Sequence, residues 1–123
     1  MRNHHSECVL ETTGAPDFVD ITGEVEDALV QSRIRDGHVT VFSNNDECSI
    51  IVQERESGLL LDIEQTLRRV RATARDRRTL VGSRSVVLPA ASGRLRLGTW
   101  QRVLLVELEG PSARSVTVHI VGD

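Results

Sequence analysis

The sequence predicts an α+β domain, mainly an antiparallel β-sandwich of about seven or eight strands with two helices on one side. Short apolar stretches separated by turn residues recur along the chain and mostly follow one another as hairpins. Two longer segments show instead the three- and four-residue apolar spacing of helices. Aromatic residues make up 2% of the 123 residues, so the core must consist of valine, leucine and isoleucine. This length predicts one domain over residues 1–123.

The first half of the chain predicts strands on either side of a helix. Residues 2–5 are polar, and we expect residues 1–5 to be disordered. Thr22 is a plausible N-cap for a helix that ends before Asp36 and Gly37. The polar loop 43–47 separates two apolar stretches and indicates a hairpin. Strands are expected at 6–13, 18–20, 39–42 and 48–54.

The second half begins with a helix opened by Ser57 and Gly58. Its apolar residues recur on one face, and its arginines gather at its C-terminal end, where they complement the helix dipole. The following segment up to Gly82 is read as a loop. Strands are expected at 85–88, where Pro89 ends the strand, and then at 95–97, 103–108 and 114–121.

Composition excludes several functional classes. The net charge of −3 gives no electrostatic reason to expect nucleic-acid binding. The sequence has no apolar run near the ~18 residues of a membrane span, so we expect no membrane association. Cys8 and Cys48 do not form a Cys-x-x-Cys pair, and the polar N-terminus does not resemble a signal peptide. We therefore expect a cytoplasmic protein with free thiols, and leave open whether these two residues lie close together.

All the basic residues are arginine, and six of them are concentrated in one segment. This segment is read as the solvated end of a helix with its following loop. The alternative is a clamp for phosphate or carboxylate, because guanidinium binds both through paired hydrogen bonds. The residues are Arg68, Arg69, Arg71, Arg75, Arg77 and Arg78.

The stretch 93–101, Gly-Arg-Leu-Arg-Leu-Gly-Thr-Trp-Gln, contains the only tryptophan. Together with residues spread over nearly the whole chain, it resembles the YjbQ family, some members of which are described as having secondary thiamine-phosphate synthase activity. The resemblance implies a compact β-rich sandwich with two helices that packs as a homotrimer. The other matching residues are Asp20-Ile21-Thr22, Asp36-Gly37, Glu54, Gly58, Leu61-Asp62, Leu80-Val81-Gly82-Ser83, Pro89, Glu107, Gly110-Pro111 and Arg114.

The chain also departs from the family pattern. Asn45-Asp46-Glu47 stands where the family carries His-Thr-Thr. The family's histidine-bearing loop after the second helix is reduced to a short arginine-rich segment, in which Arg75 is nearest to the last histidine. We therefore expect no metal at the family-equivalent site, because an amide is a poor ligand and arginine is none. No other cofactor is expected, and the four histidines present are interpreted as solvent-exposed or locally hydrogen-bonded.

Three carboxylates are candidate catalytic residues by resemblance: Glu107, Glu54 and Asp62. Glu107 lies in an apolar strand, where burial would raise its pKa and suit it to proton transfer. The alternative is an ion pair with Arg114 on the adjoining strand. Asp62 is otherwise a helix first-turn anion. Cys48 has no histidine near it in sequence and is read as a small core residue.

Six further residues are candidates for ligand binding. Trp100 is suited either to stacking on a heterocycle or to packing in the core or between subunits. In an extended segment the side chains of Thr99 and Gln101 point away from Trp100, so the three would not line one pocket without a bulge. The full set is Asn45, Arg75, Thr99, Trp100, Gln101 and Arg114.

Two functional hypotheses follow. The first is a homo-oligomeric, ligand-binding or non-catalytic member of this family with a degenerate active site, whose ligand is a small phosphorylated molecule. The second is a weak enzyme of the thiamine-phosphate synthase type, joining a pyrimidine diphosphate to a thiazole phosphate. The absence of the family's histidines favours the first hypothesis.

Overall fold

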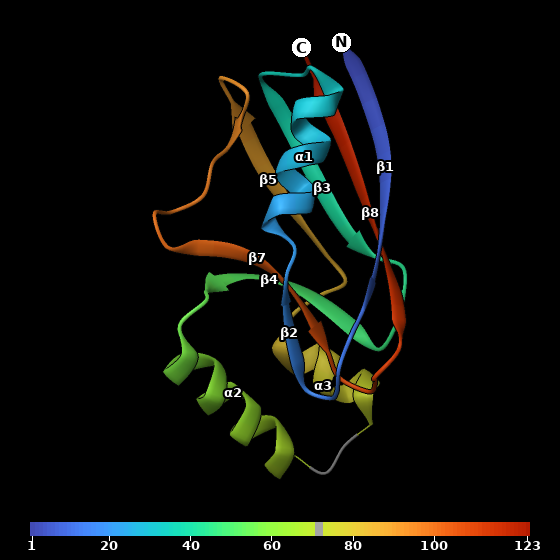
Figure 1. Ribbon diagram of the computed structural model, residues 1–123, viewed down its shortest axis with the longest axis vertical. Coiled ribbons are helices and arrows are strands. Elements are labelled where there is room, and N and C mark those ends of the chain that lie inside the picture. The colour runs from blue at the N-terminus through green and yellow to red at the C-terminus, as the bar shows by residue number, and fades with distance from the viewer. Residues whose placement is uncertain (71–72) are drawn as a thin grey trace.

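The structure is a computed structural model that describes residues 1–70 and 73–123, apart from the side chains of residues 74 and 75. The described residues form eight strands and three helices (Figure 1). The strands are β1 (Arg2–Glu11), β2 (Asp17–Asp20), β3 (Gly37–Ser43), β4 (Cys48–Glu54), β5 (Ser85–Ala91), β6 (Arg94–Leu95), β7 (Gln101–Glu107) and β8 (Ala113–Gly122). The helices are α1 (Thr22–Ser32), α2 (Ser57–Arg69) and α3 (Ala74–Val81).

The strands form two antiparallel sheets, which confirms the predicted fold class. The larger sheet has the order β1-β8-β3-β5-β6, and the smaller has the order β2-β7-β4. In Figure 1, α1 lies over one half of the larger sheet, while the smaller sheet lies toward the other end of the molecule. The two chain ends lie together at the top of this view.

The main core lies between the larger sheet, α1 and one face of the smaller sheet. Branched aliphatic residues dominate it, including Val39 and Val41 of β3 and Val103 and Leu105 of β7. A second cluster, with Leu67 from α2, packs on the opposite face of β7. Because β7 is covered on both faces, it has the continuous apolar sequence expected of a central strand.

The helices differ in number and placement from the prediction. The third helix, α3, occupies a segment read as an arginine-rich loop. Thr73 begins it with a capping box, in which Asp76 N donates to Thr73 Oγ1 at 3.2 Å and Thr73 N donates back to Asp76 Oδ2. The helices also do not share one side, since α1 packs in the main core whereas α2 and α3 contribute to the second cluster.

The N-terminus also differs from the expected disordered segment. Strand β1 begins at Arg2 and pairs in register with β8 from Arg2 opposite Gly122 to Glu11 opposite Ala113. Backbone pairing does not require apolar side chains, so a polar terminus can still be held in a sheet. In the described residues, no helix is long and apolar enough to cross a lipid bilayer.

Candidate functional site

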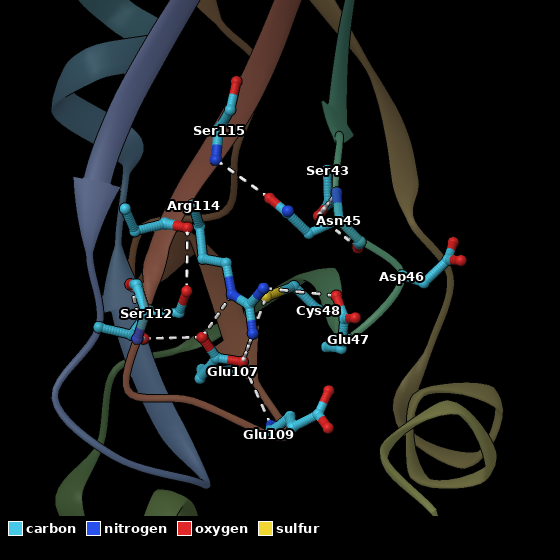
Figure 2. Close-up of polar contacts among 12 residues, drawn as sticks. Ser43, Asn45, Asp46, Glu47, Cys48, Glu107, Glu109, Ser112, Arg114 and Ser115 are labelled. Atoms are coloured by element: carbon cyan, nitrogen blue, oxygen red, sulfur yellow. Dashed lines mark hydrogen bonds and ion pairs between the residues drawn. The ribbon is translucent and has the colours of Figure 1, made fainter.

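The structure separates the candidate residues into different places. Asn45, Glu107 and Arg114 lie where β7 and β8 meet the β3–β4 loop (Figure 2). Glu54 lies with Thr99 and Trp100 at the opposite end of β4, and Asp62 lies on α2. The side chain of Arg75 lies outside the described part of the chain.

Glu107 and Arg114 form a buried, two-pronged ion pair. Arg114 Nε donates to Glu107 Oε1 at 2.7 Å, and Arg114 Nη2 donates to Glu107 Oε2 at 2.9 Å. Glu107 is 0% exposed and Arg114 is 9% exposed. Glu107 ends β7 and Arg114 lies at the start of β8, so the turn between these strands brings them together. The structure therefore contains the Glu107–Arg114 ion pair that the sequence analysis gave as the alternative to proton transfer by Glu107.

Further donors surround the Glu107 carboxylate. Thr12 Oγ1 donates to Oε1 at 2.7 Å, and Glu109 N donates to Oε2 at 3.2 Å. Burial by itself raises the pKa of Glu107. The hydrogen bonds from Arg114, Thr12 and the backbone N–H groups of Gly110 and Glu109 outweigh burial and lower that pKa to about 2. This carboxylate is therefore ionised throughout the physiological range.

The β3–β4 loop packs against the other side of Arg114. Glu47 Oε2 lies 3.4 Å from Arg114 Nη1. Ser115 N donates to Asn45 Oδ1 at 3.2 Å, which ties the loop to β8. Asp46 pairs with Arg84, whose Nη1 lies 2.7 Å from Asp46 Oδ1. Both acids of the loop therefore face arginines of the same chain.

Cys48 lies beneath the ion pair and is fully buried. Its Sγ donates to Glu107 Oε2 at 3.6 Å. Burial is the main cause that raises the pKa of Cys48 to about 12, and the negative charge of Glu107 adds to it. A thiol with that pKa supplies no thiolate near neutral pH, which agrees with its interpretation as a core residue. Cys8 is also a free thiol.

This cluster offers limited chemistry. Glu107 carries no proton to donate, and its oxygens already accept hydrogen bonds from Arg114, Thr12 and the backbone. Cys48 carries its proton and lies inside the core. Across residues 1–70 and 73–123, no three of the His, Cys, Asp and Glu side chains are grouped so that they could hold a metal ion. The polar groups of the cluster that could still bind a ligand are the side chains of Arg114 and Asn45.

The second location is a depression of about 530 Å³ at the far end of β4. Trp100 is 74% exposed and lines it together with Glu54 and Thr99. Gln101 does not line it, because its Oε1 accepts a hydrogen bond from Gly98 N at 2.7 Å and closes a turn. That turn also explains why Thr99 and Trp100 share the depression, although an extended segment would separate them.

An ion pair forms one wall of this depression. Arg102 Nε lies 2.7 Å from Asp20 Oδ2. Burial raises the pKa of Asp20, but hydrogen bonds from Arg102 and Thr22 lower it below its usual value. Thr22 itself lies in the first turn of α1 rather than at the expected N-cap, and its Oγ1 accepts from Val103 N at 2.8 Å.

The third location is a largely aliphatic groove of about 680 Å³ bounded by α2, α3 and β4, with Asp62 in its lining. Asp62 is not the first-turn anion of α2. Glu56 caps that helix instead, accepting from Gly58 N at 2.8 Å and Leu59 N at 2.7 Å. These two backbone hydrogen bonds lower the pKa of Glu56.

Sequence reasoning missed several members of the Glu107 cluster. Nothing in the sequence around Thr12 indicates its contact, because it lies 95 residues from Glu107. Glu47 was noted only as a departure from the family's His-Thr-Thr. Nothing in the sequence connects it to Arg114, which lies 67 residues away.

A model of the family described as "UPF0047 protein YjbQ-like" matches residues 6–123. The chain belongs to the YjbQ family. A UPF0047 protein of Archaeoglobus fulgidus is 37% identical over 91% of this chain and 97% of its own length. A second, from Methanothermobacter thermautotrophicus, is 33% identical over 99% of this chain and 94% of its own length.

Solved structures agree with this assignment to the YjbQ family. A YbjQ-like protein of unknown function from Sulfolobus solfataricus has a TM-score of 0.91 and 31% identity, covering 99% of each chain. A hypothetical protein from Aeropyrum pernix has a TM-score of 0.88 and 31% identity, covering 97% of this chain and 98% of that one. The descriptions of the family model and of these relatives give no activity.

Proposed function

We propose that this protein is a non-catalytic, homo-oligomeric member of the YjbQ family that binds a small phosphorylated ligand without converting it. The state of Glu107 is the observation that carries the proposal. This carboxylate is buried, bound to Arg114 at 2.7 and 2.9 Å, and held at a pKa of about 2.

A general acid must hold a proton at the working pH, and a general base must be basic enough to take one. A carboxylate with a pKa of about 2 meets neither requirement near pH 7. Covalent catalysis needs an activated nucleophile, and the Cys48 thiol, with a pKa of about 12, is not activated. These values support a structural role for the cluster.

The β3–β4 loop supports the same proposal. Asn45, Asp46 and Glu47 stand where the resemblance places His-Thr-Thr. A carboxamide does not titrate near neutral pH, so Asn45 cannot move a proton as imidazole can. Asp46 and Glu47 are already paired with Arg84 and Arg114. These ion pairs hold the loop in place, and they leave neither carboxylate free to act as an acid or a base.

Assembly with other copies would cover surfaces that a single chain leaves bare. Trp100, Leu80 and Val87 are 74%, 69% and 61% exposed. Strand β1 is ten residues long and lies at the edge of its sheet, and no strand in the described part of the chain pairs with its other side. Exposed apolar groups and open strand edges are features that partner subunits cover.

Light scattering on the purified protein tests the assembly. We expect a mass three times the 13.6 kDa of one chain. A monomer at micromolar concentration would contradict the proposed trimer.

The catalytic part is tested with hydroxymethylpyrimidine diphosphate and thiazole phosphate as substrates. We expect no product above the protein-free background, and binding of thiamine phosphate in a separate titration. Product that increases in proportion to protein concentration would overturn the proposal. Glu54→Gln and Asp62→Asn would then identify the active carboxylate, because both residues are exposed and their replacement should not unfold the protein.

A further inference from the structure

Arg114 is held so that one edge of its guanidinium group faces away from the ion pair. Nε and Nη2 bind Glu107, and Nη1 lies toward Glu47 Oε2 at 3.4 Å. The side chain of Arg114 is 9% exposed, so this edge is a nearly buried cationic donor with a fixed direction. Fixed guanidinium groups of this kind bind carboxylates and phosphates through the same N–H donors.

Glu47 covers that edge with its side chain alone. Its backbone oxygen accepts a hydrogen bond from Leu108 N at 3.0 Å, which fixes the residue against the turn after β7. Its side chain is 36% exposed, so it lies between Arg114 and solvent rather than in the core. Figure 2 shows this carboxylate beside the guanidinium, on the side opposite the Glu107 cluster.

Asn45 supplies a second donor next to this position. Its Oδ1 accepts from the backbone N–H of Ser115, the residue that follows Arg114. That hydrogen bond sets the orientation of the carboxamide. Among the described residues, Asn45 Nδ2 donates to no protein atom in the hydrogen-bond network. An unused amide donor, held against Ser115, therefore lies next to the buried cation of Arg114, the preceding residue of β8.

We propose that Glu47 acts as a built-in competitor for an oxyanion site formed by Arg114 Nη1 and Asn45 Nδ2. This inference rests on the proposed function and names the ligand group concerned, the phosphate of a phosphorylated small molecule. Glu107 neutralises Arg114, so the added carboxylate of Glu47 makes the cluster negative and disfavours a second anion. A ligand phosphate contacts Arg114 only when the Glu47 side chain moves aside.

Phosphate titrations of three variants test this inference. Glu47→Ala removes both the charge and the bulk, whereas Glu47→Gln removes only the charge. Glu109→Gln is the matched control, because it removes the same charge nearby from an exposed side chain that points away from Arg114 in Figure 2. The probes are inorganic phosphate and thiamine phosphate, and the readout is the nitrogen resonance of the Arg114 side chain, which reports contact at that group.

We expect Glu47→Ala to bind both probes about tenfold more tightly than the unmodified protein or better, which corresponds to 1.4 kcal/mol or more. The affinity of Glu47→Gln for the probes should lie between those of Glu47→Ala and the unmodified protein. The affinity of Glu109→Gln should equal that of the unmodified protein. Equal affinity in all proteins, or the same gain in Glu109→Gln, would overturn the inference. These outcomes are independent of turnover, so failure here would leave the proposed non-catalytic function standing.

Discussion

Replacing Arg114 with methionine should destabilise the protein strongly, because Glu107 would keep its charge inside the core without its main partner. Methionine has about the length of the arginine side chain up to Nε and lacks the charged end of the guanidinium group. Thr12 and the backbone N–H groups would still donate to Glu107. They cannot replace a bidentate arginine, whose charge-assisted hydrogen bonds are the strongest of the set.

The expected magnitude follows from the pKa of Glu107. A decrease from 4.5 to about 2 corresponds to about 3 kcal/mol of stabilisation of the ionised form. Breaking a buried ion pair by removing one partner costs roughly 3–5 kcal/mol. Because the pKa is lowered on folding, this stabilisation is fully present above pH 4.5 and is lost as pH falls toward 2. The cost of Arg114→Met should therefore be largest near neutral pH and decrease in acid.

Urea unfolding at a fixed protein concentration measures this cost, because the proposed subunit assembly would make apparent stability depend on concentration. Arg102→Met is the matched control, since its partner Asp20 is 2.7 Å away but Arg102 is 43% exposed. Such an exposed pair contributes at most about 1 kcal/mol. The reasoning is refuted if Arg114→Met costs no more than Arg102→Met, or if its cost does not change with pH.

Three further predictions concern the same cluster. At about pH 8, Cys48 should be alkylated more slowly than the partly exposed Cys8, because a pKa of about 12 leaves almost no thiolate at Cys48. Equal labelling of both thiols in the folded protein would contradict this prediction. Gly110→Ala should cost roughly 1–3 kcal/mol in thermal or urea unfolding, since its Cβ would lie 2.6 Å from Glu107 Oε1. Gly14→Ala is the control, with nothing within 4 Å of the added Cβ, and a similar loss in both variants would argue against a clash at Glu107. The double variant Glu107→Gln/Arg114→Met should be more stable than Arg114→Met alone, because no buried charge is left unpaired.

Much of the fold could be predicted because strands and amphipathic helices leave local patterns in the sequence. The apolar run that became β7 indicated a strand buried on both faces, and β7 is the central strand of its sheet. The helix opened at Ser57 is present as α2, with Leu67 on its buried face. The alternation of residues 114–121 likewise predicted β8.

The elements that were missed depend on signals other than apolar periodicity. The segment that forms α3 is dominated by polar residues, so its spacing gave no amphipathic pattern. Its usable signal was the pair Thr73 and Asp76, three residues apart, which form the capping box. Strand β5 continues past Pro89 to Ala91. Pro89 lies opposite His38 of β3, but its carbonyl faces the other side, where it accepts a hydrogen bond from Arg96 N at 2.9 Å. The missing N–H faces that same side, so the pairing with β3 loses no hydrogen bond.

The arrangement of the site could be predicted only in part. The Glu107–Arg114 pair was foreseeable, because the two residues end and begin strands joined by a short turn. The sequence did not indicate that Asn45 and Trp100 lie in separate places. Seven residues of β4 lie between these regions, and a strand rising about 3.3 Å per residue spans roughly 20 Å over that length. Resemblance assigns residues to a site without showing where a single chain places them.

The pKa of Glu107 in the folded protein tests the central claim most directly. Carbon NMR of the Glu107 carboxyl group, followed through a pH titration, reports its ionisation while the protein stays folded. We predict that this resonance remains that of a carboxylate from about pH 8 down to about pH 4, below which other carboxyl groups have begun to titrate. A midpoint within that range would contradict the account, because Glu107 would then exchange a proton near physiological pH and could act as an acid or base.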